Sequence, residues 1–377
     1  MIPNQRMGPT PRRILALCTR RLGDVLLTTP LLRSLRRAWP EAELDVLTLQ
    51  WSAPALEGNP DVSRVLAIPE GAGIGQTLRA IGGPRRYDLA LSTLHGDRPH
   101  YTGLWAAGTR VNVVPPGNGE GGWWKRPLST RAVVRDHDAH MVVQYLRLAD
   151  ALGIARHAEL VPPRANQPHA ALAALPKPYA VVHAAPMYAY KRWTLEGWRA
   201  LIRWLAAQGL HVVLTGGPAA DERRYVDEVA AGFGSAVSVL AGQLSFGQLT
   251  GLIEPAKVFI GTDTSVTHLA AATGVPTLAL FGPTATATWG PWPRGAVAEG
   301  ASPWRMSAPL QQRGNVWIVQ GVEHCAPCHQ EGCERRRDSR ADCLDFLPAA
   351  RVIAATDQAL RARHDAPRLI SQRGTSS

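Results

Sequence analysis

Residues 13–49 read RILALCTRRLGDVLLTTPLLRSLRRAWPEAELDVLTL, and the order of the apolar runs in this stretch indicates the fold. The apolar run 13–18 predicts one buried strand, and the run 43–49 predicts a second. Between them, a loop that contains Gly23 leads into a segment with apolar residues at helical spacing. Strand, loop, helix and strand in this order predict a parallel sheet with helices on its faces.

One amphipathic helix is expected between these two strands. Its inner side would carry Val25, Leu26, Leu31, Leu32 and Leu35, with Arg33, Arg36 and Arg37 facing water. Further strands are expected at 65–69 and 87–94, and a helix at 138–152 that Gly153 ends.

A second alternating series follows a proline-rich stretch at 162–177, which is typical of a linker. Its strands and helices are expected at 179–185, 195–209, 211–217, 221–231, 258–263, 265–274 and 276–282. The sequence therefore predicts an α/β protein of two doubly wound domains, 13–165 and 175–347. A terminal helix, 348–364, and a disordered tail, 365–377, follow. Ligands of such sheets bind outside the carboxyl ends of the strands, here in the cleft between the halves.

Composition narrows the class of partner. The chain has 377 residues, 45% hydrophobic and 19% charged, which suits a large core and argues against disorder. Its 41 basic residues, 37 Arg and four Lys, outnumber 30 acidic ones, for a net charge of +11. Residues 1–165 carry 21 bases against 14 acids (+7), and the rest 20 against 16 (+4). This surplus favours an anionic membrane surface or a phosphorylated substrate, since no nucleic-acid-binding motif is present.

The apolar runs are far shorter than the roughly 20 residues of a membrane helix. Residues 1–13 contain no apolar region of the kind that a signal peptide needs. We therefore expect a cytoplasmic protein.

Asp24 stands at the start of the expected helix, which directly follows the first strand. Such a residue is often a helix N-cap. Alternatively, the carboxylate lies at the mouth of the cleft and accepts a proton from a substrate hydroxyl, with Gly23 allowing the backbone to come close.

The segment HAAPMYAYKRW, residues 183–193, links a strand to a helix that Thr194 is expected to cap through Gly197. Lys191 and Arg192 just before a helix start would form a phosphate site, because the helix terminus adds partial positive charge. A surface pair without a ligand is the plainer alternative.

The segment GTDTSVTHLAAA, residues 261–272, places small hydroxylated residues between a strand and a helix. The backbone amides of 264–266 would point at an anion, and Asp263 would bind sugar hydroxyls. A capped helix with a buried His268 is the alternative. The loop 282–284 would lie at the same edge of the sheet.

Together these segments resemble the ADP-heptose:lipopolysaccharide heptosyltransferase family, inverting glycosyltransferases of the two-domain GT-B fold with Rossmann-like halves. The resemblance covers roughly residues 13–360. It is carried by RLGDVLLTTPLLRSLRRAWP (21–40), HAAPMYAYKRW (183–193), VVLTGGPAADE (212–222), GTDTSVTHLAAATGVPTLALFGPT (261–284) and the cysteine segment. Each motif alone is weak, but five in the family order are specific.

The resemblance implies roles for individual residues. Asp24 matches the general base that deprotonates the acceptor hydroxyl, and Gly23 lies beside it among the donor-binding residues. Lys191 matches the lysine on the diphosphate of the donor, and Asp263 the aspartate on its sugar. Thr264, Ser265 and Val266 match the amides on the phosphates, and His268 is expected to be structural. No DxD pair is positioned to bind Mg²⁺, so we expect transfer without a metal or other cofactor.

The chain departs from the resemblance in two places. Gly247 stands where many members have a glutamate that meets the ribose, and Ala285-Thr286 replace the usual Asp-Pro. Both leave the nucleotide sugar open, so a GT-B transferase with another sugar donor or a protein acceptor is an alternative. So is a catalytically degenerate member that binds a glycolipid. An NAD-dependent enzyme is disfavoured, because no G-x-G-x-x-G follows the first strand.

Four cysteines, Cys325, Cys328, Cys333 and Cys343, gather near the end of the chain. On spacing alone they suggest a structural zinc site, although a second C-x-x-C is absent. The resemblance favours structural cysteines instead, because a similar segment recurs in heptosyltransferase II-like members without an established catalytic metal.

An anionic glycolipid acceptor at the cytoplasmic face of the inner membrane is the partner that the resemblance implies. The loops 96–103 and 115–125 would meet it, with Arg98, His100 and Lys125 as candidate acceptor-binding residues. The alternative is that these are ordinary surface-loop residues that bind no ligand.

Overall fold

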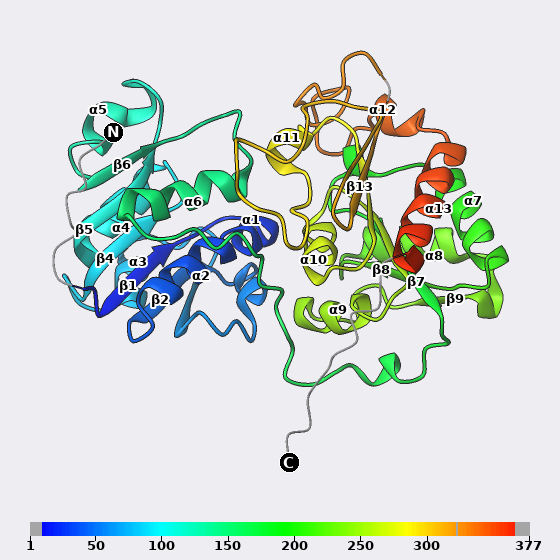
Figure 1. Ribbon diagram of the computed structural model, residues 1–377, viewed down its shortest axis with the longest axis horizontal. Coiled ribbons are helices and arrows are strands. Elements are labelled where there is room, and N and C mark those ends of the chain that lie inside the picture. The colour runs from blue at the N-terminus through cyan, green and yellow to red at the C-terminus, as the bar shows by residue number, and fades with distance from the viewer. Residues whose placement is uncertain (1–9, 322, 366–377) are drawn as a thin grey trace.

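A computed structural model describes residues 10–321 and 323–365. Residues 13–134 contain a six-stranded parallel sheet in the order β3-β2-β1-β4-β5-β6 (Figure 1). The strands are β1 (Arg13–Leu17), β2 (Glu43–Leu49), β3 (Arg64–Ile68), β4 (Tyr87–Ser92), β5 (Ala107–Val114) and β6 (Arg131–Val134). The helices of this half are α1 (Leu22–Leu27), α2 (Thr29–Ala38), α3 (Ile74–Ile81), α4 (Asp97–Ala106), α5 (Gly122–Lys125) and α6 (Met141–Leu152), with the 3-10 turns η1 (Ala53–Leu56) and η2 (Gly119–Gly121).

Residues 179–320 contain a seven-stranded sheet in the order β12-β13-β11-β10-β7-β8-β9. Only the β12–β13 pair is antiparallel. The strands are β7 (Tyr179–Ala185), β8 (His211–Gly216), β9 (Val237–Val239), β10 (Val258–Thr262), β11 (Thr277–Phe281), β12 (Leu310–Arg313) and β13 (Val316–Gln320). Its helices are α7 (Leu195–Ala207), α8 (Ala220–Ala230), α9 (Phe246–Ile253), α10 (Ser265–Thr273), α11 (Thr286–Trp289), α12 (Asp342–Asp345) and α13 (Ala349–Asp365), with the 3-10 turns η3 (Ala170–Leu172), η4 (Ala189–Lys191) and η5 (Gly234–Ala236).

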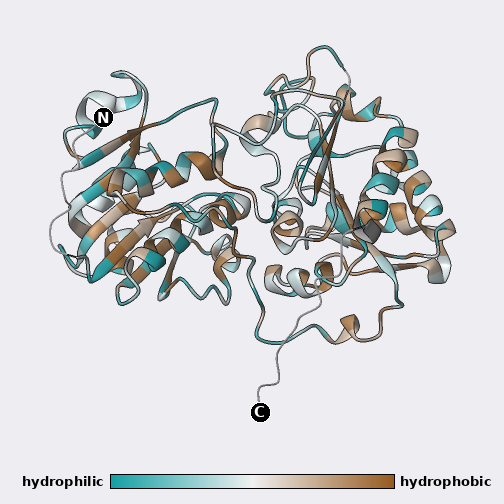
Figure 2. Ribbon diagram, in the orientation of Figure 1, coloured by the Kyte–Doolittle hydropathy of each residue, from teal (hydrophilic) through white to brown (hydrophobic). Residues whose placement is uncertain are grey.

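The strands are apolar throughout because both faces of each sheet are covered. Along β1, Ile14 and Ala16 pack with α2 and α6, whereas Leu15 and Leu17 pack on the other face with residues of α3 and α4. Figure 2 shows hydrophobic colour running along the strands of both halves. Two layered α/β units with parallel sheets therefore confirm the predicted fold class.

The single helix expected after β1 is wrong: the segment forms two helices, α1 and α2, that meet at Thr28. Pro30 has no N–H to donate to the carbonyl of Leu26, four residues earlier. The Thr29 hydroxyl donates to that carbonyl instead, at 2.8 Å. The break turns α1 away from α2, and in Figure 1 α1 lies on the side facing the C-terminal half.

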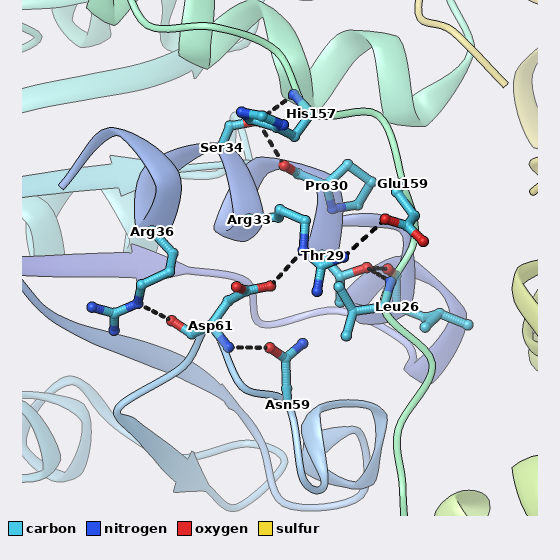
Figure 3. Close-up of polar contacts among 11 residues, drawn as sticks. Leu26, Thr29, Pro30, Arg33, Ser34, Arg36, Asn59, Asp61, His157 and Glu159 are labelled. Atoms are coloured by element: carbon cyan, nitrogen blue, oxygen red, sulfur yellow. Dashed lines mark hydrogen bonds and ion pairs between the residues drawn. The ribbon is translucent and has the colours of Figure 1, made fainter. Parts of the chain in front are cut away.

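The prediction that Arg33 and Arg36 face water is also wrong, because both are partly buried. Figure 3 shows Arg33 between Asp61 and Glu159, with both nitrogen–oxygen distances 3.0 Å. Arg36 donates to the Asp61 carbonyl at 3.0 Å. The two arginines thus tie α2 to the loop before β3 and to the start of the linker; only Arg37 is exposed, as expected.

Capping residues set the ends of helix α6. The helix expected from residue 138 begins at Met141, because the His140 ring accepts the N–H of Val142 as N-cap. It ends at Gly153, whose φ of 71° is left-handed, as predicted. The terminal helix runs from Ala349 to Asp365, and the expected tail lies otherwise outside the described residues. The sequence reasoning did not identify β5, β6, β9, β12 and β13.

The two halves are in direct contact. Helix α1 packs against α10, and η1 packs against α9. The ring of His140 in the N-terminal half contacts the Gly290 carbonyl of the other half, at 2.8 Å. In the part of the chain that the structure describes, no helix has the length and apolarity of a membrane span.

Candidate active site

Asp24 is the third residue of α1, and its side chain is 5% exposed. Arg21 is the N-cap of this helix, so Asp24 is not the N-cap residue, although the Arg21 backbone N–H donates to its carboxylate. Its Oδ1 lies 3.3 Å from Arg20 Nε but has no hydrogen-bond partner within the described chain. A buried acceptor oxygen without a partner is uncommon and indicates a group that the protein itself does not satisfy.

The electrostatic setting of Asp24 suits a base. Burial raises the pKa of this carboxyl above its usual value, and the charges of Arg20, Arg21 and Lys191 work against that rise. A raised pKa makes the carboxylate a stronger proton acceptor.

Lys191 and Asp263 come from neighbouring parallel strands. Lys191 lies in η4, after β7, and Asp263 follows β10, which pairs with β7. Lys191 Nζ is 2.5 Å from Asp263 Oδ2. Burial acts to raise the pKa of Asp263, but the charge and hydrogen bond of Lys191 outweigh it, and the pKa is lowered. The pair places a fixed ammonium at the carboxyl edge of the sheet.

Helix α10 begins beside this pair. Thr264 is its N-cap and accepts the N–H of Thr267. The amides of Ser265 and Val266 belong to the first turn, where a helix has no internal acceptors for them. His268 is buried, which lowers its pKa to about 4, so the ring is neutral at pH 7. A capped helix with a buried histidine is therefore present, and its first turn follows Asp263 directly.

The two sides of the site meet at Gly23. A Cβ at this position would lie 3.5 Å from Cα of Ser265 and 3.6 Å from the His268 ring. Asp24 is the next residue, and Lys191 is close enough to act on its pKa. The structure therefore brings together Asp24, Gly23, Lys191, Asp263 and the first turn of α10, which lie on three separate segments of the sequence.

Sequence reasoning missed two side chains here. Thr284 hydrogen-bonds Asp263 from the loop after β11, whose place at this edge was expected although no role was given to the residue. Arg20 pairs with Asp24, and its spacing of four residues was the available signal. Arg192, in contrast, turns away and pairs with Asp221 at 3.0 Å.

Of the three candidate acceptor-binding residues, one lines a pocket and two are buried in contacts within the protein. Arg98 lines a pocket of about 180 Å³ at the carboxyl ends of β1, β2 and β3, with Thr19, Glu70 and Thr102. The Oγ1 atom of Thr102 is buried and has no hydrogen-bond partner in the described chain.

The other two candidates are already engaged within the protein. His100 is 1% exposed, and its Nδ1 lies 2.9 Å from the Gly96 carbonyl. Lys125 is 2% exposed and pairs with Asp97 at 2.8 Å. Both hold α5 against the start of α4, so Arg98 alone of the three borders an open pocket.

The model of glycosyltransferase family 9 (heptosyltransferase) matches residues 122–315, just over half of the chain. The chain belongs to glycosyltransferase family 9. It is therefore an enzyme that transfers a sugar. Its relatives include Escherichia coli K12 lipopolysaccharide heptosyltransferase 3, 29% identical over 373 residues that cover 92% of this chain and 96% of that one. Lipopolysaccharide heptosyltransferase 1 of Pseudomonas aeruginosa is 30% identical, covering 77% of this chain and 84% of that one.

The fold of this family 9 glycosyltransferase matches a solved structure. E. coli ADP-heptose lipopolysaccharide heptosyltransferase II aligns with a TM-score of 0.69 at 21% identity, over 93% of this chain and 99% of that one. This similarity confirms the GT-B fold, two Rossmann-like halves that face each other.

Gly247 of the family 9 enzyme has a packing reason. It lies in α9, where a Cβ would stand 2.5 Å from the Ala165 amide and 2.6 Å from Glu57 Oε2. The linker therefore passes too close for any side chain at 247. The Thr286 hydroxyl, at the second departure, donates to the Arg305 carbonyl at 2.6 Å and anchors α11.

The cysteine segment of this glycosyltransferase backs the Lys191 loop. Ala189 N donates to the Arg337 carbonyl at 3.1 Å, and Cys343 packs with Tyr190. All five cysteines are free. Burial and the neighbouring thiols Cys328, Cys325 and Cys333 raise the pKa of Cys343 to about 12. Residues 10–321 and 323–365 contain no group of three or more His, Cys, Asp or Glu side chains arranged to hold a metal ion.

Proposed function

We propose that this chain transfers heptose from ADP-heptose to a lipopolysaccharide inner-core acceptor by a single, inverting displacement. Two curated relatives with high coverage are lipopolysaccharide heptosyltransferases, and the matched family is named for that activity. The observation that carries the mechanism is the buried Asp24 Oδ1, which has no hydrogen-bond partner in the described chain and lies next to the proposed donor site.

Asp24 takes the proton of the acceptor hydroxyl. At the same time the oxygen of that hydroxyl attacks the anomeric carbon from the face opposite the leaving group. The bond from that carbon to the diphosphate oxygen breaks, and its electron pair leaves with ADP. Lys191 and the amides of Ser265 and Val266 offset the charge that develops on the phosphate. Because these groups supply the positive charge, transfer is expected to proceed in the presence of a chelator.

The donor must draw Lys191 partly away from Asp263. In the structure the ammonium and the carboxylate lie 2.5 Å apart and neutralise each other. A diphosphate binds the ammonium and frees Asp263 oxygens for sugar hydroxyls, while Thr284 keeps the carboxylate in place. The pair therefore holds the lysine in position before the donor arrives.

We assign the acceptor to the N-terminal half. Its +7 charge and the Arg98 pocket suit a phosphorylated glycolipid, and Thr102 offers an unpaired hydroxyl. Such an acceptor is anchored in lipid, so the enzyme would work at the cytoplasmic face of the inner membrane as a peripheral protein.

Product analysis with ADP-heptose and a set of truncated core acceptors tests the proposal. Transfer to one acceptor with inversion at the anomeric carbon is the expected result. Asp24→Asn should lose transfer by at least about 10²-fold, since a positioned base contributes that much or more, while calorimetry shows ADP binding within about twofold of the parent. The control is Asp227→Asn, on the exposed side of α8. Normal transfer by Asp24→Asn would exclude it as the base.

A transferase for a different nucleotide sugar is the second candidate, favoured by the glycine that the linker imposes at 247. Thermal stabilisation by ADP-heptose against UDP- and GDP-sugars separates the two, because the true donor binds the folded state most tightly. A larger shift with a UDP- or GDP-sugar would replace heptose in the proposal and leave the mechanism standing.

A further inference from the structure

Arg20 has no part in donor or acceptor binding as described above, yet it contacts the proposed base. Its Nε lies 3.3 Å from Asp24 Oδ1, and the two side chains are 35% and 5% exposed. The contact joins the last residues of the β1–α1 loop to the first turn of α1. An opposite charge at this distance favours the ionised carboxylate.

The other half of the enzyme contributes a ring to the same arginine. Arg20 Cζ lies 5.9 Å from the ring centroid of Trp289, the last residue of α11. Its neighbour Arg21 lies 5.1 Å from the ring of Tyr188, just before the Lys191 turn. Both distances are within reach of a cation–π contact. These contacts exist only while the two halves are together.

Lys191 is also a cation near Asp24, but the donor diphosphate would neutralise it. Arg21 is exposed and acts through solvent. Cys18 and Tyr145 carry no charge at neutral pH, because burial raises both of their pKa values, that of Cys18 to about 11. The ionisable groups that act on Asp24 are Arg20, Arg21, Lys191, Cys18 and Tyr145, and the neutral His268 ring lies against Gly23. Arg20 is therefore the partly buried cation that remains when donor is bound.

We propose that Arg20 is a positioning residue that keeps Asp24 ionised and oriented, and that Trp289 sets Arg20 in place when the halves close. The position of the base would thus depend on both halves, because Trp289 belongs to the other one. This inference rests on the proposed role of Asp24.

The first test follows the carboxyl directly, without substrate. Aspartate carboxyl ¹³C signals are titrated by NMR in the full chain, with the Asp24 signal assigned by its loss in Asp24→Asn. Arg20→Gln should raise the Asp24 pKa by about one pH unit, the lower end of what an adjacent opposite charge gives. Arg20→Lys should restore at least half of that difference. An unchanged Asp24 pKa in Arg20→Gln overturns the proposal.

The second test follows the ionisation of Asp24 through the pH dependence of catalysis. The acid limb of kcat/KM with ADP-heptose and the accepted core acceptor should move to higher pH in Arg20→Gln, with KM for ADP-heptose within about twofold. At a pH on that limb, a shift of one unit is about a tenfold loss, which higher pH recovers. Arg21→Gln should shift less, and Arg37→Gln, on the exposed side of α2, should not shift at all. A loss in Arg20→Gln that is the same at every pH indicates a merely structural role.

Trp289 is tested by a double-variant cycle. Trp289→Leu should shift the Asp24 pKa in the same direction as Arg20→Gln but by less. The double variant should show the same Asp24 pKa shift as Arg20→Gln alone. Additive shifts would separate Trp289 from Arg20 and overturn the coupling to closure. If parent enzyme transfers no heptose while the NMR shift appears, the proposed function fails and the inference about Arg20 stands.

Discussion

At the scale of single residues, Lys191 is the main cation of the proposed donor site. It neutralises Asp263 in the free chain and is the side-chain cation proposed for the diphosphate. Lys191→Ala should therefore leave Asp263 buried without its partner and remove charge from the leaving-group site. We expect kcat/KM for donor to fall by about 10² to 10³, the usual cost of one lost donor to a developing charge.

Steady-state kinetics with varied ADP-heptose measure this loss. Lys257→Ala is the matched control, because Lys257 stands before β10, at the opposite edge of the sheet. A Lys191→Ala enzyme with unchanged donor kinetics would remove the lysine from the donor site.

Arg98 carries the acceptor prediction alone, since His100 and Lys125 are engaged within the protein. Arg98→Ala should raise KM for the core acceptor by about tenfold, as expected for one lost hydrogen bond to a charged group. KM for the donor should stay the same. Arg79→Ala, on the neighbouring helix α3, is the control. Equal effects on both substrates would place Arg98 outside the acceptor pocket.

The sequence singled out Asp24, Lys191 and Asp263 because each lies between a recognisable strand and the next helix, where strand ends of parallel sheets converge, and because each matches a motif of the family that the sequence resembles. It could not predict the burial of His100 and Lys125. Their exposure depends on how α5 packs against α4, which involves Trp124 against the His100 ring. Local sequence contains no signal for a contact between segments about 20 residues apart.

At the scale of elements, the long strands and the helices with caps were predictable, whereas the break between α1 and α2 was missed. The apolar spacing continues across Thr28, so periodicity alone predicts one helix. Pro30 was the signal, because a proline inside a helix removes one hydrogen bond. Strands β5 and β6 were missed because their residues include Arg110, Asn112 and Arg131, which interrupt the apolar runs.

Helix α9 provides a prediction at this scale. Gly247→Ala should place a methyl group 2.5 Å from the linker amide of Ala165 and destabilise the fold by about 1–3 kcal/mol. Gly251→Ala in the same helix meets only Leu172, at 3.8 Å, and should stabilise it by up to about 1 kcal/mol. Urea unfolding of both variants measures the difference. Equal stability of the two would mean that the linker moves aside freely.

At the scale of the whole molecule, buried histidines link the fold to pH. Burial lowers the pKa of His140 to about 3 and those of His183 and His268 to about 4. His140 bridges the halves, and the other two lie in the C-terminal sheet and in α10. Each stays neutral in the folded chain while its unfolded counterpart takes up a proton below the ordinary pKa of 6.5.

The unfolded state therefore binds more protons than the folded state below pH 6.5, and stability falls as the pH drops toward 4. Each histidine contributes up to about 1.4 kcal/mol per pH unit in this window. The raised pKa values of Asp24 and Glu222 act in the opposite direction, whereas the lowered pKa values of His95, His100 and His211 add to the loss of stability. Urea midpoints at pH 7.5, 6.5 and 5.5 should show a steep loss only across the last interval. His140→Asn keeps a helix N-cap and should reduce the slope between pH 6.5 and 5.5, whatever its stability at pH 7.5. An unchanged slope would mean that His140 is already protonated in the folded chain, and its contact with the Gly290 carbonyl would then be that of a charged ring.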